Sequence, residues 1–80
     1  MEKTLQSDRH KALIDTLVKQ RKSVGMSQQE LANAIDEYQS YIARLESGQR
    51  RLDVIEFIRM CSFLELDPIS VIQDLLVIPE

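Results

Sequence analysis

The chain has 80 residues, a formal net charge of −3 at pH 7 and a single cysteine. At this length we expect one domain over residues 1–80, with a core of modest size. One thiol excludes a disulfide framework, and with one histidine it leaves no Cys/His cluster for a metal site. The charged start, Met1-Glu2-Lys3-Thr4, is unlike a signal peptide, and no apolar run approaches the roughly 20 residues that cross a bilayer. We therefore expect a cytoplasmic protein without a membrane partner.

The acidic residues are concentrated toward the C-terminus. Residues 1–26 contain six Lys/Arg against three Asp/Glu, residues 27–52 contain three against four, and residues 53–80 contain one against six. The first two segments together carry +2, and the last carries −5. Because attraction to a polyanion depends on the local field, the overall charge does not exclude an anionic partner for the N-terminal part.

The first predicted element is an amphipathic helix from about residue 8 to 23. Leu13 and Leu17, and likewise Ile14 and Val18, are apolar pairs at i and i+4, which is the spacing of one helix face. Gly25 follows this stretch, at the position where a left-handed residue commonly ends a helix.

A second, short helix is predicted directly after Ser27. Ser27 and Glu30 have the capping-box spacing, in which each side chain bonds the backbone amide of the other residue. Asp36-Glu37 is expected to end this helix. Its inner face is expected to consist of Leu31, Ala32 and Ile35.

A third helix is predicted from about residue 39 to 46, with Ile42 and Leu45 inward and Ser47-Gly48 ending it. About three residues separate it from the second helix. The small side chain of Ala32 allows two such helices to cross closely at a steep angle. The outer face of the third helix is then free to enter a major groove.

Two further helices follow. Asp53 with Glu56 is an N-cap signal for the fourth, and Asp67-Pro68 is a strong start for the fifth, expected over about 68–78. No segment alternates with period two, so the predicted fold class is all-α, a compact five-helix bundle with a helix-turn-helix at about 27–46. The inner face of the fourth helix is expected to contain Val54, Phe57, Ile58, Cys61 and Leu64.

The chain resembles the lambda-repressor/Cro-like (XRE-type) helix-turn-helix family over roughly residues 10 to 76. The resemblance rests on many spaced positions that agree together. They are Arg21-x-x-x-Gly25-x-Ser27-Gln28-x-x-Leu31-Ala32, Tyr41-Ile42-x-Arg44-Leu45-Glu46-x-Gly48, Arg50-Arg51, Phe57, Leu64 and Asp67-Pro68. It implies a DNA-binding transcriptional regulator, similar to prophage Cro-type regulators or to the small controller proteins of restriction–modification systems, with no cofactor and no small-molecule ligand.

The resemblance also implies roles for individual residues. Gln39, Ser40 and Arg44 would read base edges, since Gln pairs with adenine, Arg with guanine, and Ser with either. Arg21 and Glu46 match a pair that forms a buried salt bridge in the family. Contacts to the DNA backbone are implied for Gln28, Tyr38, Tyr41, Arg50 and Arg51.

This chain departs from the family pattern at the turn. Asp36 stands where the family often has Gly, and Asp tolerates the left-handed conformation better than most residues. Tyr38 stands where the family often has Ser or Thr, so the third helix loses a hydroxyl cap. Asp36 and Glu37 also place negative charge near the expected DNA surface.

The sequence predicts no catalytic role for its single cysteine and single histidine. Cys61 lies on the apolar side of the fourth helix and is expected to be a buried structural thiol. His10 has no acidic or thiol partner at a useful spacing and is interpreted as a surface residue. One His and one Cys cannot supply a nucleophile, a base and an orienting group, so we do not expect an enzyme.

The fifth helix has two apolar stripes. Ile69, Ile72 and Leu76 form one, and we expect the other, Val71, Leu75 and Ile78, to form a homodimer interface. A dimer would read an inverted repeat in double-stranded DNA, with half-sites about 34–36 Å apart. Two alternatives remain open: both stripes wrap the small core, or the chain is a protein-binding adaptor or antitoxin on the same scaffold.

Overall fold

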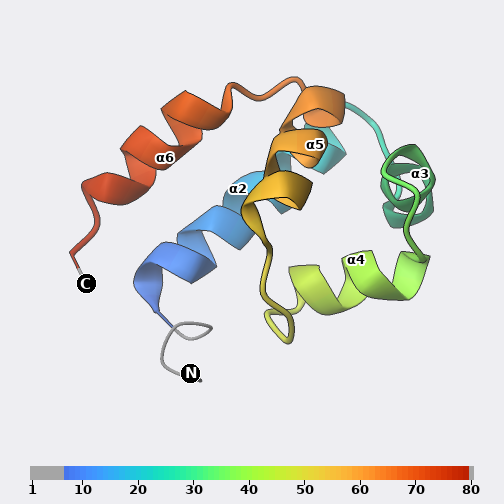
Figure 1. Cartoon of the computed structure of the whole chain (residues 1–80), viewed down its shortest axis with the longest axis horizontal. Coiled ribbons are helices and arrows are strands. Elements are labelled where there is room, and N and C mark those ends of the chain that lie inside the picture. Colours follow the sequence, from blue (N-terminus) through green and yellow to red (C-terminus); the bar gives the residue numbers. More distant parts are fainter. Residues whose placement is uncertain (1–6, 80) are drawn as a thin grey trace.

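The computed structural model describes residues 7–79 and contains five helices in that range. They are α2 (Asp8–Ser23), α3 (Gln28–Ala34), α4 (Gln39–Glu46), α5 (Val54–Leu64) and α6 (Pro68–Leu76), as Figure 1 shows. No strand occurs among the described residues, and the predicted all-α fold class is confirmed. The start of the chain, Met1 to Thr4, from which no signal peptide is expected, lies outside this range.

Four of the five helices begin at a side-chain cap. The N-cap residues are Ser7 for α2, Ser27 for α3, Asp53 for α5 and Asp67 for α6, and each accepts a hydrogen bond from a first-turn amide. The helix starts predicted from the capping signals are therefore confirmed. The exception is α4. Its N-cap residue Tyr38 makes no side-chain cap bond, as expected for a residue that stands where the family often has Ser or Thr.

Left-handed residues end the helices and set the direction of the chain that follows. After α2, Gly25 has φ 81°, and the amides of Gly25 and Met26 bond back into the last turn of the helix. The same arrangement ends α3 with Asp36 at φ 59°, so the turn accepts an aspartate where only glycine is free of strain. Glu65, just after α5, is also left-handed.

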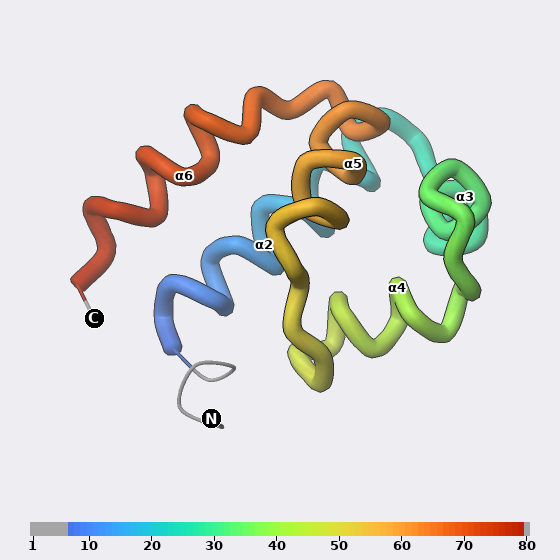
Figure 2. The backbone as a smooth tube through the Cα atoms, viewed as in Figure 1, coloured from blue at the N-terminus to red at the C-terminus, as the bar shows by residue number. Residues whose placement is uncertain are grey.

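The first helix of the bundle, α2, lies at its centre. It contacts α4, α5 and α6, while α3 packs most extensively against α4. Figure 2 shows α6 running back along α2 in the opposite direction, with α4 on the other side of the molecule. The two helices of the predicted helix-turn-helix are thus held away from the C-terminal helix.

The core is made by the inner faces of all five helices. Its most buried side chains come from α3, α4 and α5, and they include Leu31, Ala32, Ile35, Ile42 and Leu45 as predicted. Two residues that we expected inside α5 are not in the core. Val54 is 68% exposed and Ile58 is 48% exposed, whereas Met60 is 1% exposed. The inner stripe of α5 therefore keeps Phe57, Cys61 and Leu64 from the predicted one and contains Met60 in place of Val54 and Ile58.

The stripe of α6 that packs on the core is the one that we expected to be exposed as a dimer interface. Val71 is 5% exposed within the single chain, and Leu75 packs against the same core. Arg9 on α2 donates from Nε to the carbonyl of Ile78 at 2.8 Å, which holds the end of α6 against α2. Val71 and Leu75 therefore lie on the docking side of α6, because a helix this short has to bury one stripe on its own core, and Ile78, just after the helix, is half-buried.

The outward stripe of α6 is apolar. Ile69, Ile72 and Leu76 are 62%, 45% and 63% exposed. None of the helices in residues 7–79 combines the length and apolar character required to cross a membrane.

Candidate nucleic-acid interface

The three residues predicted to read bases share the exposed side of α4. Gln39, Ser40 and Arg44 are all exposed, while Ile42 and Leu45 on the opposite side are fully buried. Because those two side chains wedge α4 against α3 and α2, the helix has one possible outer face. The structure thus brings the predicted readers together on a single surface.

A buried ion pair fixes the far end of α4. Arg21 Nε lies 2.7 Å from Glu46 Oε2, and Arg21 Nη2 lies 3.0 Å from Glu46 Oε1. The Arg21 side chain also donates to the carbonyl of Met26 at 2.8 Å, and the whole residue is only 8% exposed. Two parallel bonds to one carboxylate fix both orientation and distance, so α4 is held in register with α2.

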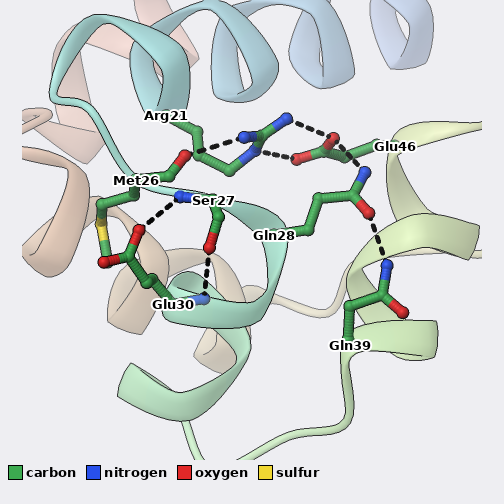
Figure 3. Close-up of polar contacts among 7 residues, drawn as sticks. All are labelled: Arg21, Met26, Ser27, Gln28, Glu30, Gln39 and Glu46. Carbon is green, nitrogen blue, oxygen red and sulfur yellow. Dashed lines mark hydrogen bonds and ion pairs between the residues drawn. The ribbon is translucent and has the colours of Figure 1, made fainter.

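Gln28 extends this contact to the start of α4. Its Nε2 donates to Glu46 Oε1 at 2.9 Å, and its Oε1 accepts from Gln39 Nε2 at 2.7 Å. Figure 3 shows the resulting chain of side chains from Arg21 through Glu46 and Gln28 to Gln39. The resemblance implied only a DNA-backbone contact for Gln28, and the residue spacing alone gives no signal for these side-chain contacts.

The start of α3 is held by the predicted capping box. Ser27 Oγ accepts from the amide of Glu30 at 3.0 Å, and Glu30 Oε1 accepts from the amide of Ser27 at 2.8 Å (Figure 3). These bonds keep Gln28, the next residue, at a defined place at the start of the helix.

An aromatic side chain joins α4 to the loop that follows it. The guanidinium of Arg50 lies 4.5 Å from the centre of the Tyr41 ring, a cation–π contact. Burial raises the pKa of Tyr41, and a hydrogen bond to Arg50 opposes that shift. Arg51 and Tyr38 are both exposed on the surface. The side chains predicted to contact a DNA backbone thus come from several places: Gln28 from the start of α3, Tyr38 from just before α4, Tyr41 from α4, and Arg50 and Arg51 from the loop after it.

The two acidic residues of the turn differ in exposure. Asp36 is exposed, whereas Glu37 is half-buried and contributes to the raised pKa of Tyr41, as the smallest of its causes. Both lie immediately before α4, so their negative charge remains close to the predicted readers.

The apolar stripe of α6 continues onto α5. An open groove of about 260 Å³ lies between the two helices. Side chains from both helices line it, together with three residues from outside them: Leu13, Leu52, Asp53, Val54, Phe57, Ile58, Pro68, Ile69, Ile72 and Leu75. The groove lies between α5 and α6, whereas the predicted base-reading residues are on α4, which lies on the other side of the molecule from α6 (Figure 1).

His10 is less exposed than the sequence suggested. It is half-buried, and its Nε2 is buried without a hydrogen-bond partner among the described residues. It lines an open cavity together with Lys11, Asp15 and Glu46. Burial lowers the pKa of His10, and the nearby charge of Arg51 lowers it further. The surface interpretation of His10 is thus wrong in part, because the residue is half-buried and lines this cavity opposite Ser47 and Gly48.

Cys61 is buried in the core, as expected, and burial raises the pKa of its thiol. Within residues 7–79 no three His, Cys, Asp or Glu side chains come together in a way that could hold a metal ion.

Comparisons with known proteins agree with this arrangement. The profile of the helix-turn-helix family HTH_3 matches residues 17–70. An XRE-family like protein from Pseudomonas syringae pv. tomato str. DC3000 is 37% identical, with a TM-score of 0.83 over 94% of this chain and 92% of that one. No curated protein sequence gives a significant match.

A more distant structural relative is the clp gene regulator ClgR from Corynebacterium glutamicum. One structure of it is 22% identical, with a TM-score of 0.77 over 89% of this chain and 76% of that one. A second is 22% identical, with a TM-score of 0.75 over 89% and 92%. At this identity the likeness is one of fold.

Removing the carboxylate of the buried pair should destabilise the protein strongly. We expect Glu46→Ala to lower the free energy of unfolding by about 3–5 kcal/mol, because it leaves the buried guanidinium of Arg21 without its counter-charge. The matched control is Asp15→Ala, which breaks the exposed Asp15–Lys19 pair and should cost about 1 kcal/mol or less. Thermal unfolding of both variants measures the difference. A Glu46→Ala melting temperature equal to that of the wild type would contradict the structural role of the pair.

His10 should make stability depend on pH. Its folded-state pKa is below the unfolded value of 6.5, so the unfolded state binds the proton more readily. Stability should therefore fall as the pH drops through 6.5 and become level below the folded-state pKa. Urea unfolding of the wild type and of His10→Asn across this range isolates the effect, since other groups titrate in both proteins. Parallel pH profiles for the two proteins would refute it.

Proposed function

The chain belongs to the XRE-type helix-turn-helix family of DNA-binding transcription regulators, and we propose that it reads a palindromic operator as a homodimer. In this proposal α4 is the reader helix, and its partner is double-stranded DNA containing an inverted repeat. The observation that carries the proposal is the exposed face of Gln39, Ser40 and Arg44 on a helix whose other side is fully buried.

The chemistry of this face suits the major groove. An amide can pair with the N6 and N7 positions of adenine, and a guanidinium with the O6 and N7 positions of guanine. Ser40 can donate to or accept from either edge. The packing of Ile42 and Leu45, together with the Arg21–Glu46 pair, presents these groups without a rearrangement of the free protein. Such preorganisation lowers the cost of binding.

Contacts to phosphate would set the register on the duplex. Arg50 and Arg51 are exposed in the loop after α4, and the Tyr41 ring keeps the Arg50 guanidinium beside that helix. Tyr38, and the backbone amide of Gln28 at the start of α3, complete the proposed set. Of the acidic residues after residue 52, Asp67 caps α6 and Asp74 lies on it, on the other side of the molecule from α4 (Figure 1), whereas Glu56 on α5 is close enough to Tyr41 to raise the pKa of that side chain. Asp67 and Asp74 therefore oppose this binding less than Glu56 does.

The proposed dimer uses the apolar face of α5 and α6. Ile69, Ile72 and Leu76 stand exposed beside the groove that Val54 and Ile58 also line. Monomeric proteins seldom leave a contiguous surface of this kind uncovered, and a two-fold contact would cover both copies at once. It would also present two α4 helices to successive major grooves, about 34–36 Å apart. Of the interface residues expected from the sequence, Val71 packs in the chain's own core, and Leu75 packs against that core and also lines this groove.

In vitro selection from a randomised duplex pool tests the reading function. We expect the purified protein to enrich a two-fold symmetric motif, with binding that weakens by orders of magnitude between about 50 and 200 mM salt. Arg44→Ala should relax one base position in each half-site and cost about 1–3 kcal/mol of binding. Arg59→Ala is the control, because Arg59 is exposed on α5 and pairs with Glu56.

If no sequence is enriched even at low salt, the helix-turn-helix is a scaffold for protein contacts and the DNA-reading proposal fails. If Arg44→Ala instead weakens binding by the same factor for every operator sequence, Arg44 contacts the DNA backbone and not a base.

A charge placed on the exposed stripe should separate the dimer. We expect the wild type to sediment as a dimer at micromolar concentration and Ile72→Glu to sediment as a monomer with unchanged helical content. The variant should bind an inverted repeat no more tightly than a single half-site. Gln29→Glu, which adds the same charge to the exposed side of α3, should remain dimeric. A wild type that is monomeric throughout the micromolar range would overturn the dimer.

A further inference from the structure

The end of α6 is capped by an arginine from the first turn of α2. Arg9 Nε donates to the carbonyl oxygen of Ile78 at 2.8 Å, and Arg9 Nη2 donates to that of Leu76 at 3.4 Å. The last carbonyls of a helix have no partner within the helix, and α6 has no basic residue in its own last turn. We propose that Arg9 is a positioning residue that holds α6 in the orientation required for the dimer and thereby sets the strength of that dimer.

The docking of α6 depends on few other contacts. The helix has nine residues, and a helix of that length is unstable in water unless it packs against the rest of the protein. Asp67 caps its start, but of its nine residues only Val71 is buried, and Leu75 is half-buried. The bonds that Arg9 makes at the far end are therefore expected to decide how much of the time α6 stays docked.

A guanidinium suits this position for two reasons. A cation near the C-terminal end of a helix interacts favourably with the partial negative charge of the last carbonyls. The donors of a guanidinium also have a fixed planar arrangement, so Nε and Nη2 can bond two carbonyls at the same time. The first turn of α2 is itself held by Ser7, whose hydroxyl accepts from the amide of His10 at 3.1 Å. Figure 2 shows the end of α6 beside this start of α2.

Loss of the Arg9 bonds would change the surface that the dimer uses. The exposed side chains of Ile69, Ile72 and Leu76 keep their places relative to α5 only while α6 remains docked, and the groove between the two helices is lined from both. A helix that is docked for only part of the time has to be ordered when two copies associate, and this cost weakens association. The inference rests on the proposed dimer, whereas the capping of α6 by Arg9 does not.

The test uses Arg9→Met, which keeps the apolar stem of the side chain and removes the guanidinium. We expect the backbone amides of α6 to exchange with deuterium up to about tenfold faster than in the wild type, while those of α4 are unaffected. The dimer dissociation constant from sedimentation should rise by about five- to tenfold, because both copies must dock α6 before they associate. Arg9→Lys keeps the charge without the planar donors and should recover part of both losses.

Lys19→Met is the matched control. It removes the same charge from the same helix, but Lys19 is exposed and its ion pair, at 2.9 Å, is with Asp15 of α2 itself. The control should exchange and dimerise as the wild type does. A second background is the monomeric variant Ile72→Glu. There, adding Arg9→Met should still accelerate the exchange of the α6 amides, although no dimer is present.

The outcomes separate the possible roles of Arg9. Unchanged exchange of the α6 amides in Arg9→Met would mean that other contacts hold the helix, and equal acceleration in all the described helices would give Arg9 a role in overall stability only; each overturns the positioning role. Faster exchange of α6 with an unchanged dissociation constant would overturn the control of the dimer. If the wild type is monomeric, the proposed dimer fails first and this control fails with it, while the exchange data still show whether Arg9 holds α6.

Discussion

The buried pair of Arg21 and Glu46 is the interaction on which the rest of the arrangement depends. It connects the end of α2 to the end of α4, and through Gln28 it also reaches the start of α3. Apolar packing alone tolerates small rotations of a helix, but a bidentate ion pair whose guanidinium also bonds a backbone carbonyl does not. A buried guanidinium without its partner is also costly, so alternative packings of the three helices are penalised. The orientation of α4 is thus fixed by charge as well as by shape.

Much of this fold could be predicted from the sequence, because its signals are local. The boundaries of α3 follow from the Ser27–Glu30 capping box and from Asp36, and those of α4 from its apolar spacing and from Gly48. Each of these residues acts on amides and carbonyls within one turn of itself. The grouping of the predicted readers on one face follows equally directly, because period 3.6 and two buried positions leave one outer side.

What could not be predicted depends on contacts between distant elements. The sequence shows two apolar stripes on α6, but which one docks is decided by the position of α2, where Arg9 holds the end of the helix. The exposure of Val54 has the same origin, since α6 leaves an open groove there. Likewise, the orientation of the Gln28 amide follows from a carboxylate on another helix. Periodicity contains no information about any of these.

The two left-handed acidic residues have a consequence for how this chain can change. Asp36 and Glu65 hold φ values of 59° and 60°, a conformation that costs an L-residue roughly 1–2 kcal/mol and glycine almost nothing. Replacing either residue with glycine would therefore remove this backbone strain and stabilise the folded state. A domain this small has little margin, so such a gain could compensate for a destabilising substitution on the reader helix. A stabilising glycine at one of these turns would thus allow substitutions on the reader helix that change its base preference without loss of the fold.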